Sequence, residues 1–207
     1  SILQRLARIP AGSGFNLGLA TGATPLGLYH RLASAANAGR FSAAAVRGFN
    51  LDEYIGLPGR TAVERARHPQ SFAAFMEREL FGRMKPGFAA THLPSGHLVD
   101  PERLETELAL HPADWTEQGA DSGKTIRIRP DAQSPYLQCV KHEILDGYEQ
   151  AIRSAGGIDL QVVGVGERGH VAFHEAGIPF ADSRMLLVRL DENTRRNAVA
   201  AGHFPGL

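Results

Sequence analysis

The chain has 207 residues, of which 43% are hydrophobic and 21% charged. This is ordinary globular usage and argues against a disordered or collagen-like chain. The 22 basic and 22 acidic residues balance, so the sequence lacks the basic excess of proteins that bind nucleic acid or anionic membranes. No apolar run is long enough for a membrane span. Cys139 is the single cysteine and cannot form an internal disulfide, so we expect a reducing, cytoplasmic compartment.

The first predicted elements are a strand, a tight turn and a helix. Apolar residues alternate over 15–20, which predicts the strand. Thr24 is predicted as the N-cap and Pro25 as the first residue of the helix, because a hydroxyl residue followed by proline is typical of a helix start. Gly39 is predicted to end this helix, since glycine is common just beyond helix ends.

The next stretch predicts a second strand over 46–51, followed by a loop over 55–67. Ser71 is predicted to cap a helix that stops near Gly82. Residues 83–100 contain several prolines and glycines, so they are predicted to be irregular.

The middle of the chain is harder to interpret. Residues 101–110 predict a short helix, and the polar stretch 111–131 predicts an extended surface insertion. Ser134 opens the longest predicted helix, which two glycines at 156–157 end. The mostly apolar run 158–164 predicts a strand covered on both faces.

The last predicted strand covers 185–190, and a helix is predicted to start at Asp191. Alternating strands and helices predict the α/β class, with a Rossmann-like, mostly parallel sheet and helices on both faces. We expect a single domain over 1–207. Ligands of such sheets bind beyond the carboxyl ends of the strands, and three motifs fall there.

The first motif, 21–25 (TGATP), joins the first strand to its helix. Gly22 lets backbone N–H groups approach an anion, and the helix N-terminus adds partial positive charge. Thr21 and Thr24 supply hydroxyls, so these residues and Ala23 are candidates for binding a phosphate or carboxylate. An ordinary capped turn is the alternative explanation, and the Gly-Lys-Ser/Thr of a P-loop is absent from the sequence.

The second motif places Asp52 and Glu53 directly after the second strand. Neighbouring side chains in a strand point to opposite sides, so one carboxylate can face a cleft while the other binds backbone or a basic group. A carboxylate in a cleft can act as a general base. A solvated turn is the alternative.

The third motif, 164–175 (GVGERGHVAFHE), begins with the G-x-G-x-x-G pattern of dinucleotide sites. Such a site needs a long helix next, and a nearby glycine and proline interrupt one. His170 and Glu175 instead indicate an imidazole oriented by a carboxylate for acid–base chemistry. His170 and His174 are four residues apart, but no third ligand is evident, so no metal site is expected.

Four segments, in this order and spacing, resemble the glucosamine-6-phosphate deaminase (isomerase) family: 19–25 (LATGATP), 49–58 (FNLDEYIGLP), 68–72 (HPQSF) and 164–175. The related 6-phosphogluconolactonase family shares the fold and the Gly-His turn but typically lacks the stretch at 52–58. The resemblance covers roughly 15–82 and 158–197, with a longer middle region than the family norm. It implies a chain that is incomplete at both ends.

The resemblance implies a cytoplasmic enzyme of amino-sugar (N-acetylglucosamine) catabolism. It would convert a hexosamine 6-phosphate, glucosamine 6-phosphate first, into fructose 6-phosphate and ammonia, without a metal or organic cofactor. Asp52 would move a proton between C2 and C1 through an enol-type intermediate, and His170, oriented by Glu175, would assist ring opening. Thr21 to Thr24, with Glu53, would bind the substrate. The expected partner is a small-molecule sugar phosphate, with no nucleic acid or membrane; homo-oligomer formation is left open.

Three residues depart from the family pattern. Arg168 stands where the family usually has Asp or Asn, which changes charge and hydrogen bonding beside the ring-opening group. His174 and Ala176 replace the usual Asn and Pro around Glu175. Two alternatives therefore stay open: a lactonase-like hydrolase on the same scaffold, and a sugar-phosphate sensor without catalysis.

Overall fold

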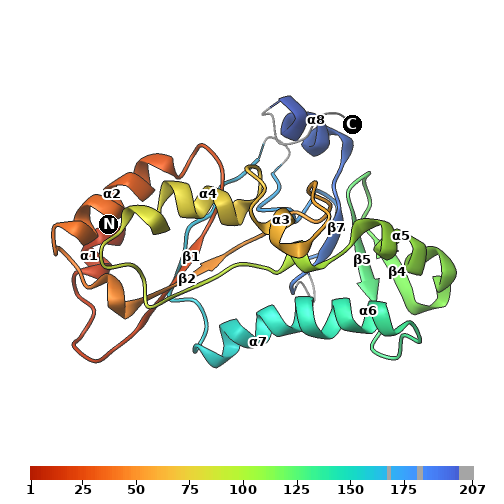
Figure 1. The fold of residues 1–207 in the computed structure, drawn as a ribbon, viewed down its shortest axis with the longest axis horizontal. Helices are drawn as coiled ribbons and strands as arrows, with labels where there is room; N and C mark the ends of the chain where they lie inside the picture. Colours follow the sequence, from red (N-terminus) through yellow and green to blue (C-terminus); the bar gives the residue numbers. More distant parts are fainter. Residues whose placement is uncertain (167–168, 181–183, 201–207) are drawn as a thin grey trace. The chain divides into compact units, whose positions relative to one another are not determined.

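The computed structural model describes residues 1–166, 169–180 and 184–200. The chain, drawn as a ribbon in Figure 1, divides into two compact units. Unit 1 comprises Ser1–Tyr54, Pro58–Pro94 and Ile152–Gly164, and unit 2 comprises Ile55–Leu57, Ser95–Ala151 and the described residues from Val165 onward. Each unit has its own sheet and its own cluster of buried apolar side chains.

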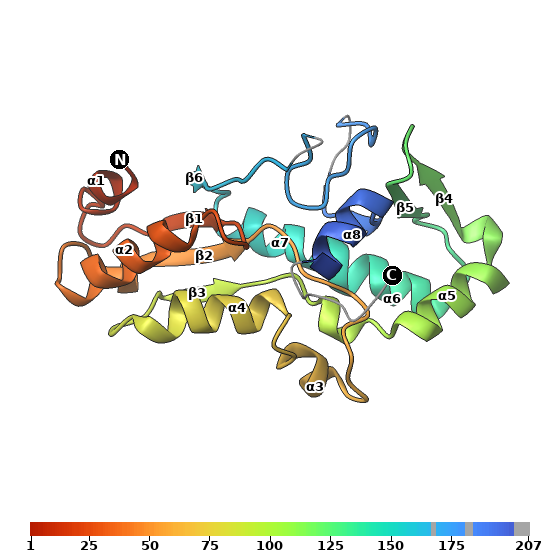
Figure 2. The ribbon, with the colours of Figure 1, turned by 90° about the horizontal axis from the view of Figure 1, so that it is seen from above.

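Unit 1 is built on a parallel sheet. Its strands are β1 (Phe15–Leu19), β2 (Val46–Asn50), β3 (Ala90–His92) and β6 (Leu160–Gln161), in the order β3-β2-β1-β6. β1 pairs with β2 from Phe15 opposite Val46 to Leu19 opposite Asn50, and Figure 2 shows β1, β2 and β3 side by side. The first two predicted strands and the α/β class are confirmed.

Helices flank this sheet. They are α1 (Ile2–Leu6), α2 (Leu26–Asn37), α3 (Ala62–Ala66) and α4 (Phe72–Glu79), with 3-10 turns at Ala43–Ala45 and Phe81–Arg83. α2 and α4 lie along the same side of β1 and β2 (Figure 1). Tyr29, Leu32 and Met76 from these helices join Leu17 and Leu19 in one fully buried cluster. Burial contributes about 1.5–3 kcal/mol for each such side chain, so this packing holds the strands that carry the first two motifs.

The helix boundaries of unit 1 follow the prediction with one difference. Ser71 caps α4 as predicted, because its Oγ accepts the N–H of Ala74 at 3.0 Å. At the start of α2, however, Pro25 and not Thr24 occupies the N-cap position, and no side chain caps this end. The first helical N–H bonds to a carbonyl of the preceding turn instead, so no hydroxyl cap is required. Gly39 follows the helix with φ of +67°, as expected of a helix end.

Two stretches predicted to lack regular structure contain it. Within 55–67, α3 follows Thr61, whose Oγ1 accepts the N–H of Glu64 at 3.2 Å. Within 83–100, β3 pairs with β2 in parallel. Both predictions were wrong because α3 depends on its cap and β3 on its neighbouring strand, and neither element is long enough to show its own apolar periodicity.

The strand predicted over 158–164 is shorter than expected and is not covered on both faces. Leu160 and Val162 pack against the core of unit 1, whereas Gln161 is exposed and Val163 is 50% exposed. Alternate side chains therefore face the core and the solvent, which is the pattern of a strand covered on one face.

Unit 2 contains an antiparallel sheet of β4 (Trp115–Gln118), β5 (Lys124–Ile128) and β7 (Leu187–Arg189), in the order β4-β5-β7. Its helical segments are α5 (Pro101–Leu110), α6 (Pro135–Cys139), a π-helical segment (Val140–Asp146), the first five residues of α7 (Gly147–Ser154), and α8 (Glu192–Ala200), with 3-10 turns at Gly96–Leu98 and Pro112–Asp114. The predicted helices at 101–110, after Ser134 and after Asp191 are confirmed. Among the described residues, no helix has the length and apolar character needed to cross a membrane.

The stretch 111–131 forms a β-hairpin of β4 and β5 and not the predicted surface insertion. Thr125, Ile126 and Ile128 of β5 are buried, and the two isoleucines join the core of unit 2. The polar composition misled the prediction because it does not show that β5 pairs with β7, far along the chain, or that its isoleucines join the core formed with the nearby helices α5 and α6.

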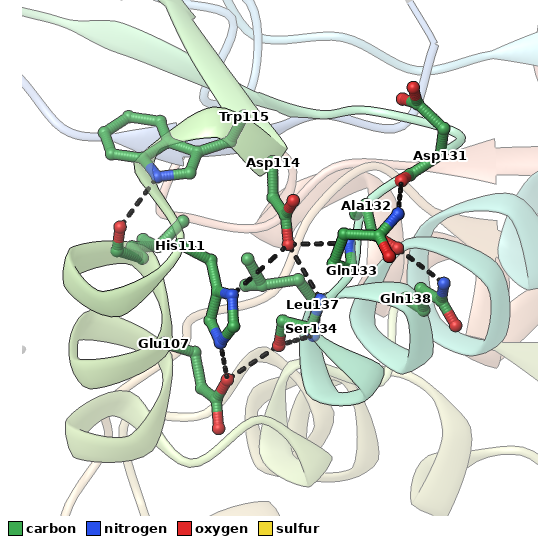
Figure 3. Close-up of polar contacts among 11 residues, drawn as sticks. Glu107, His111, Asp114, Trp115, Asp131, Ala132, Gln133, Ser134, Leu137 and Gln138 are labelled. Atoms are coloured by element: carbon green, nitrogen blue, oxygen red, sulfur yellow. Dashed lines mark hydrogen bonds and ion pairs between the residues drawn. The ribbon is translucent and has the colours of Figure 1, made fainter.

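Hydrogen bonds of polar side chains connect the base of this hairpin to the start of α6 (Figure 3). The carboxylate of Asp114 accepts the backbone N–H groups of Gln133 and Ser134, each at 2.8 Å. Ser134 Oγ donates to Glu107 Oε2 at 2.7 Å and accepts the N–H of Leu137 at 3.2 Å. The two backbone hydrogen bonds hold the pKa of Asp114 below its ordinary value. These polar residues therefore contribute to the fold of the hairpin.

Candidate active site

Parallel pairing brings the turns after β1 and β2 to the same edge of the sheet in unit 1. Leu19 lies opposite Asn50, and the N–H of Leu51 donates to the Leu19 carbonyl at 3.0 Å just beyond the strands. The Thr21 hydroxyl that follows β1 donates a hydrogen bond to the Asp52 carboxylate that follows β2. The structure therefore brings the first two motifs together.

The turn after β1 has an open backbone. Gly22 has φ of +112°, which residues with a Cβ rarely adopt, and no heavy atom lies within 4 Å of the place where its Cβ would stand. Ala23 and Thr24 are exposed. The buried Tyr29 hydroxyl donates to the Ala20 carbonyl and holds the start of the turn. An open turn before a helix is a geometry that can accept an anion.

Asp52 is half-buried, and its pKa is raised to about 7. Loss of solvent is the largest cause, the negative charge of Glu53 adds to it, and the Thr21 hydrogen bond opposes it. A carboxyl group with this pKa exists in both protonation states near neutral pH. It can therefore take a proton from a substrate and return it.

Glu53 binds backbone. Its carboxylate accepts three N–H groups, from Tyr54 at 2.8 Å and from Phe72 and Ala73 at 2.9 Å. Phe72 and Ala73 begin α4, where N–H groups lack helical partners, so Glu53 completes the cap that Ser71 begins. Burial outweighs these bonds and raises the pKa of Glu53. Of the two adjacent acids, Glu53 is thus the one that binds backbone; its predicted contact with substrate stays a prediction.

His170 and Glu175 lie close together in unit 2. The distance from His170 Nδ1 to Glu175 Oε2 is 3.8 Å. Glu175 is 1% exposed, and its Oε1 accepts the N–H of Asp191 at 3.2 Å. Glu175 Oε2 and His170 Nδ1 have no hydrogen-bond partner within the described part of the chain. A buried carboxylate with one oxygen left toward an imidazole is suited to orient that ring.

The glycines of the third motif shape the turn beneath the imidazole. The N–H of Gly166 donates to the His170 carbonyl, and the N–H of Gly169 donates to the Gly166 carbonyl, both at 2.9 Å. A Cβ on Gly166 would stand 2.2 Å from His170 Nε2, so the ring packs directly on the glycine backbone. No helix occurs within residues 169–180, where a dinucleotide site would need one.

The predicted site residues thus form two groups. Those of the first two motifs lie in unit 1, and His170 and Glu175 lie in unit 2. That both groups serve one substrate stays a prediction, and Arg168 lies outside the described residues. Within residues 1–166, 169–180 and 184–200, no three or more His, Cys, Asp or Glu side chains are grouped so that they could hold a metal ion.

Comparisons with known proteins identify relatives over most of the chain, although no protein-family model matches. Glucosamine-6-phosphate deaminase of Shewanella loihica is 36% identical over 174 residues, 84% of this chain and 46% of that protein. Glucosamine-6-phosphate deaminase 2 of Bacillus subtilis is 35% identical over 192 residues, 92% and 58% of the two chains. The deaminase of Shouchella clausii is 33% identical over 200 residues, 97% and 61% of the two chains. The chain is a homologue of glucosamine-6-phosphate deaminases.

The comparison with solved structures agrees with these sequence matches. A solved structure of a monomeric glucosamine-6-phosphate deaminase of the NagB superfamily matches with a TM-score of 0.61 and 26% identity, over 99% of this chain and 66% of that chain. The resemblance that the four segments indicated is therefore confirmed. The chain spans 46–61% of the length of the three deaminases compared by sequence.

Sequence reasoning missed two features of this deaminase homologue. The α4 partners of Glu53 lie 19 and 20 residues further along the chain, and no local pattern indicates such a pairing. Gly123, in the turn between β4 and β5, lies directly against Glu175. Its only signal in the sequence is a glycine within a polar stretch.

Proposed function

We propose that the protein converts glucosamine 6-phosphate and water into fructose 6-phosphate and ammonia. The observation that carries this proposal is Asp52. It is a half-buried carboxyl group at the end of a parallel strand, bonded to Thr21 and with a pKa of about 7, in a chain homologous to deaminases that carry this name. A base with this pKa suits proton transfer at a carbon next to a carbonyl group at neutral pH.

In the proposed mechanism, Thr21 to Thr24 bind the phosphate through backbone N–H groups and hydroxyls. His170, oriented by Glu175, moves a proton from the C1 hydroxyl to the ring oxygen, so that the ring opens to an aldehyde. Asp52 then takes the proton from C2 while a proton of the C2 ammonium group passes to the C1 oxygen, which gives an enolamine. Asp52 returns its proton to C1, so that C1 carries a hydroxyl group and a protonated C=N bond is left at C2. Water adds at C2 and ammonia leaves, so the net reaction hydrolyses a C–N bond. Glu53 contributes by holding the turn of Asp52 against α4.

The proposal extends to properties of the whole protein. We include in it a Rossmann-like description of the sheet, a single-domain organisation, amino-sugar catabolism as the metabolic role, and a cytoplasmic location. Homo-oligomer formation is left open.

The test is an assay of ammonia and fructose 6-phosphate with the full-length protein and glucosamine 6-phosphate. Asp52→Asn keeps the shape of the side chain but cannot accept the C2 proton, so kcat should fall by about a hundredfold or more while KM changes little. Asp131→Asn, at an exposed carboxylate, is the matched control.

Three results would contradict the proposal. Full activity of Asp52→Asn would remove Asp52 as the base. Acid release from 6-phosphogluconolactone without ammonia from amino sugars would favour the lactonase-like hydrolase. Tight binding of glucosamine 6-phosphate without turnover would favour the sensor.

A further inference from the structure

We infer that the β4–β5 hairpin is part of the catalytic scaffold, and that its turn at 119–123 positions Glu175 against His170. This inference rests on the proposed function, because it relies on the orienting role of Glu175. The hairpin, Glu175 and His170 all belong to unit 2. The hairpin lies in the stretch that the sequence predicted to be a surface insertion, so the inference gives that stretch a function.

Gly123 contacts the side chain of Glu175 directly. A Cβ on Gly123 would stand 2.5 Å from Glu175 Cβ, 2.7 Å from Glu175 Cγ and 3.4 Å from Asp191 Cβ. The first two distances are shorter than any tolerated carbon–carbon contact. Gly123 is not in the left-handed region of φ, so lack of space, and not backbone conformation, requires glycine here.

The same turn also holds the backbone that follows Glu175. The N–H of Ala120 donates to the Gly177 carbonyl at 3.0 Å. A Cβ on Gly177, which has φ of +83°, would stand 3.1 Å from the backbone nitrogens of Ala120 and Asp121. The N–H of Ile178 bonds back to the Glu175 carbonyl at 3.2 Å. The loop that carries Glu175 is therefore bound to the hairpin through its backbone as well as through the side chain.

The sheet of unit 2 supplies the remaining contact. β5 pairs with β7, as Figure 1 also shows, so the hairpin determines where Asp191 lies just after β7. The N–H of Asp191 donates to Glu175 Oε1 at 3.2 Å. With Oε1 bound to Asp191 and the carbon chain packed on Gly123, Oε2 is the atom left to face His170 Nδ1.

This arrangement has little tolerance for movement. The 3.8 Å between Glu175 Oε2 and His170 Nδ1 is already longer than a hydrogen bond. A methyl group on Gly123 must push Glu175 or the turn away, because the two cannot occupy the same space. Gly123 is thus a positioning residue, which acts on the imidazole through Glu175 and does not touch the substrate.

The first experiment compares Gly123→Ala with Ser122→Ala, an exposed neighbour in the same turn, both in the full-length protein. Gly123→Ala should lower kcat for glucosamine 6-phosphate about tenfold or more with KM little changed, since the phosphate-binding turn belongs to unit 1. Ser122→Ala should keep the activity of the unmodified protein. Unchanged kcat in a folded Gly123→Ala protein would overturn the inference.

A double-mutant comparison separates positioning from general destabilisation. If Gly123 acts through Glu175, adding Gly123→Ala to Glu175→Gln should cause no further loss of kcat. A further loss as large as that of Gly123→Ala alone would overturn the inference. If Gly123→Ala does not fold, Gly177→Asn replaces it in these experiments. Asparagine can adopt the positive φ of Gly177, and its Cβ would make a close contact with the same turn that is longer than the contacts at Gly123.

A measurement without turnover distinguishes this inference from the proposed function. The ring signals of His170, followed by NMR, should shift in Gly123→Ala and stay in place in Ser122→Ala. If the signals shift but the protein releases no ammonia, the proposed function fails and the positioning holds. If the protein is an active deaminase and Gly123→Ala moves neither kcat nor the His170 signals, the positioning fails.

Discussion

The stability of the folded protein should depend on pH through the protonation of Asp52. Its pKa is raised from the ordinary value of 3.8 to about 7, so the folded state prefers the protonated acid. The stabilisation this provides is complete below the ordinary pKa and is lost as pH rises through about 7. We expect the stability of Asp52→Asn to exceed that of the unmodified protein by a margin that grows between about pH 5 and about pH 8, on the order of 2 kcal/mol. Denaturant unfolding at both pH values measures this margin.

The control for this prediction is Asp131→Asn, which removes one negative charge at an exposed position. Its margin over the unmodified protein should change little between the two pH values. A pH-independent margin for Asp52→Asn would show that Asp52 does not gain its proton on folding.

For individual residues, the sequence predicted positions that depend on neighbouring residues in the chain. The position of Asp52 at the edge of the sheet could be predicted because it follows a recognisable strand, and the proximity of His170 to Glu175 because both lie in one short motif after a strand; their catalytic roles stay predictions. The partners of Glu53 could not be predicted, because they lie on α4 and meet Glu53 only once β2 and α4 have packed. Gly123 was missed for the same reason, since its neighbour Glu175 lies far along the chain.

Among the elements, α6 depends on a single buried hydroxyl. Ser134 is fully buried, caps the N–H of Leu137 and donates to Glu107 (Figure 3). Ser134→Ala removes both bonds and should lower the free energy of unfolding by about 1–2 kcal/mol. Urea unfolding measures this, with Ser122→Ala as the exposed serine control. A loss no greater than that of the control would contradict the role of the cap.

The elements that could be predicted carry their own start signals. Ser71, Ser134 and Asp191 each precede a confirmed helix and accept an N–H group from its first turn. The missed strands depend on partners remote in the sequence, whereas the missed helix α3 has a local cap, Thr61, but is only five residues long. β3 is three residues long and exists through its ladder with β2, and β5 pairs with β7, far along the chain. Local patterns reveal caps and periodicity, but they do not reveal which distant segment completes a short strand.

For the whole molecule, alternating strands and helices predicted the parallel sheet of unit 1 but not the antiparallel sheet of unit 2. The two sheets have separate apolar clusters, one that includes Leu17 and one that includes Ile126. If the chain is a single domain, it should unfold in one transition despite these two clusters, because each cluster would be unstable once the other has unfolded. The cooperativity of unfolding therefore tests the single-domain proposal directly.

Leu17→Ala and Ile126→Ala place one cavity in each cluster, at side chains that are 0% and 4% exposed. Each should lower the free energy of unfolding by about 2–5 kcal/mol, through lost transfer energy and the cavity left behind. If the chain is one domain, both variants shift the same single transition in calorimetry, and Val63→Ala, at a side chain that is 59% exposed, leaves it in place. Two transitions, each moved by only one of the core variants, would contradict the single-domain proposal, because the two clusters would then unfold independently.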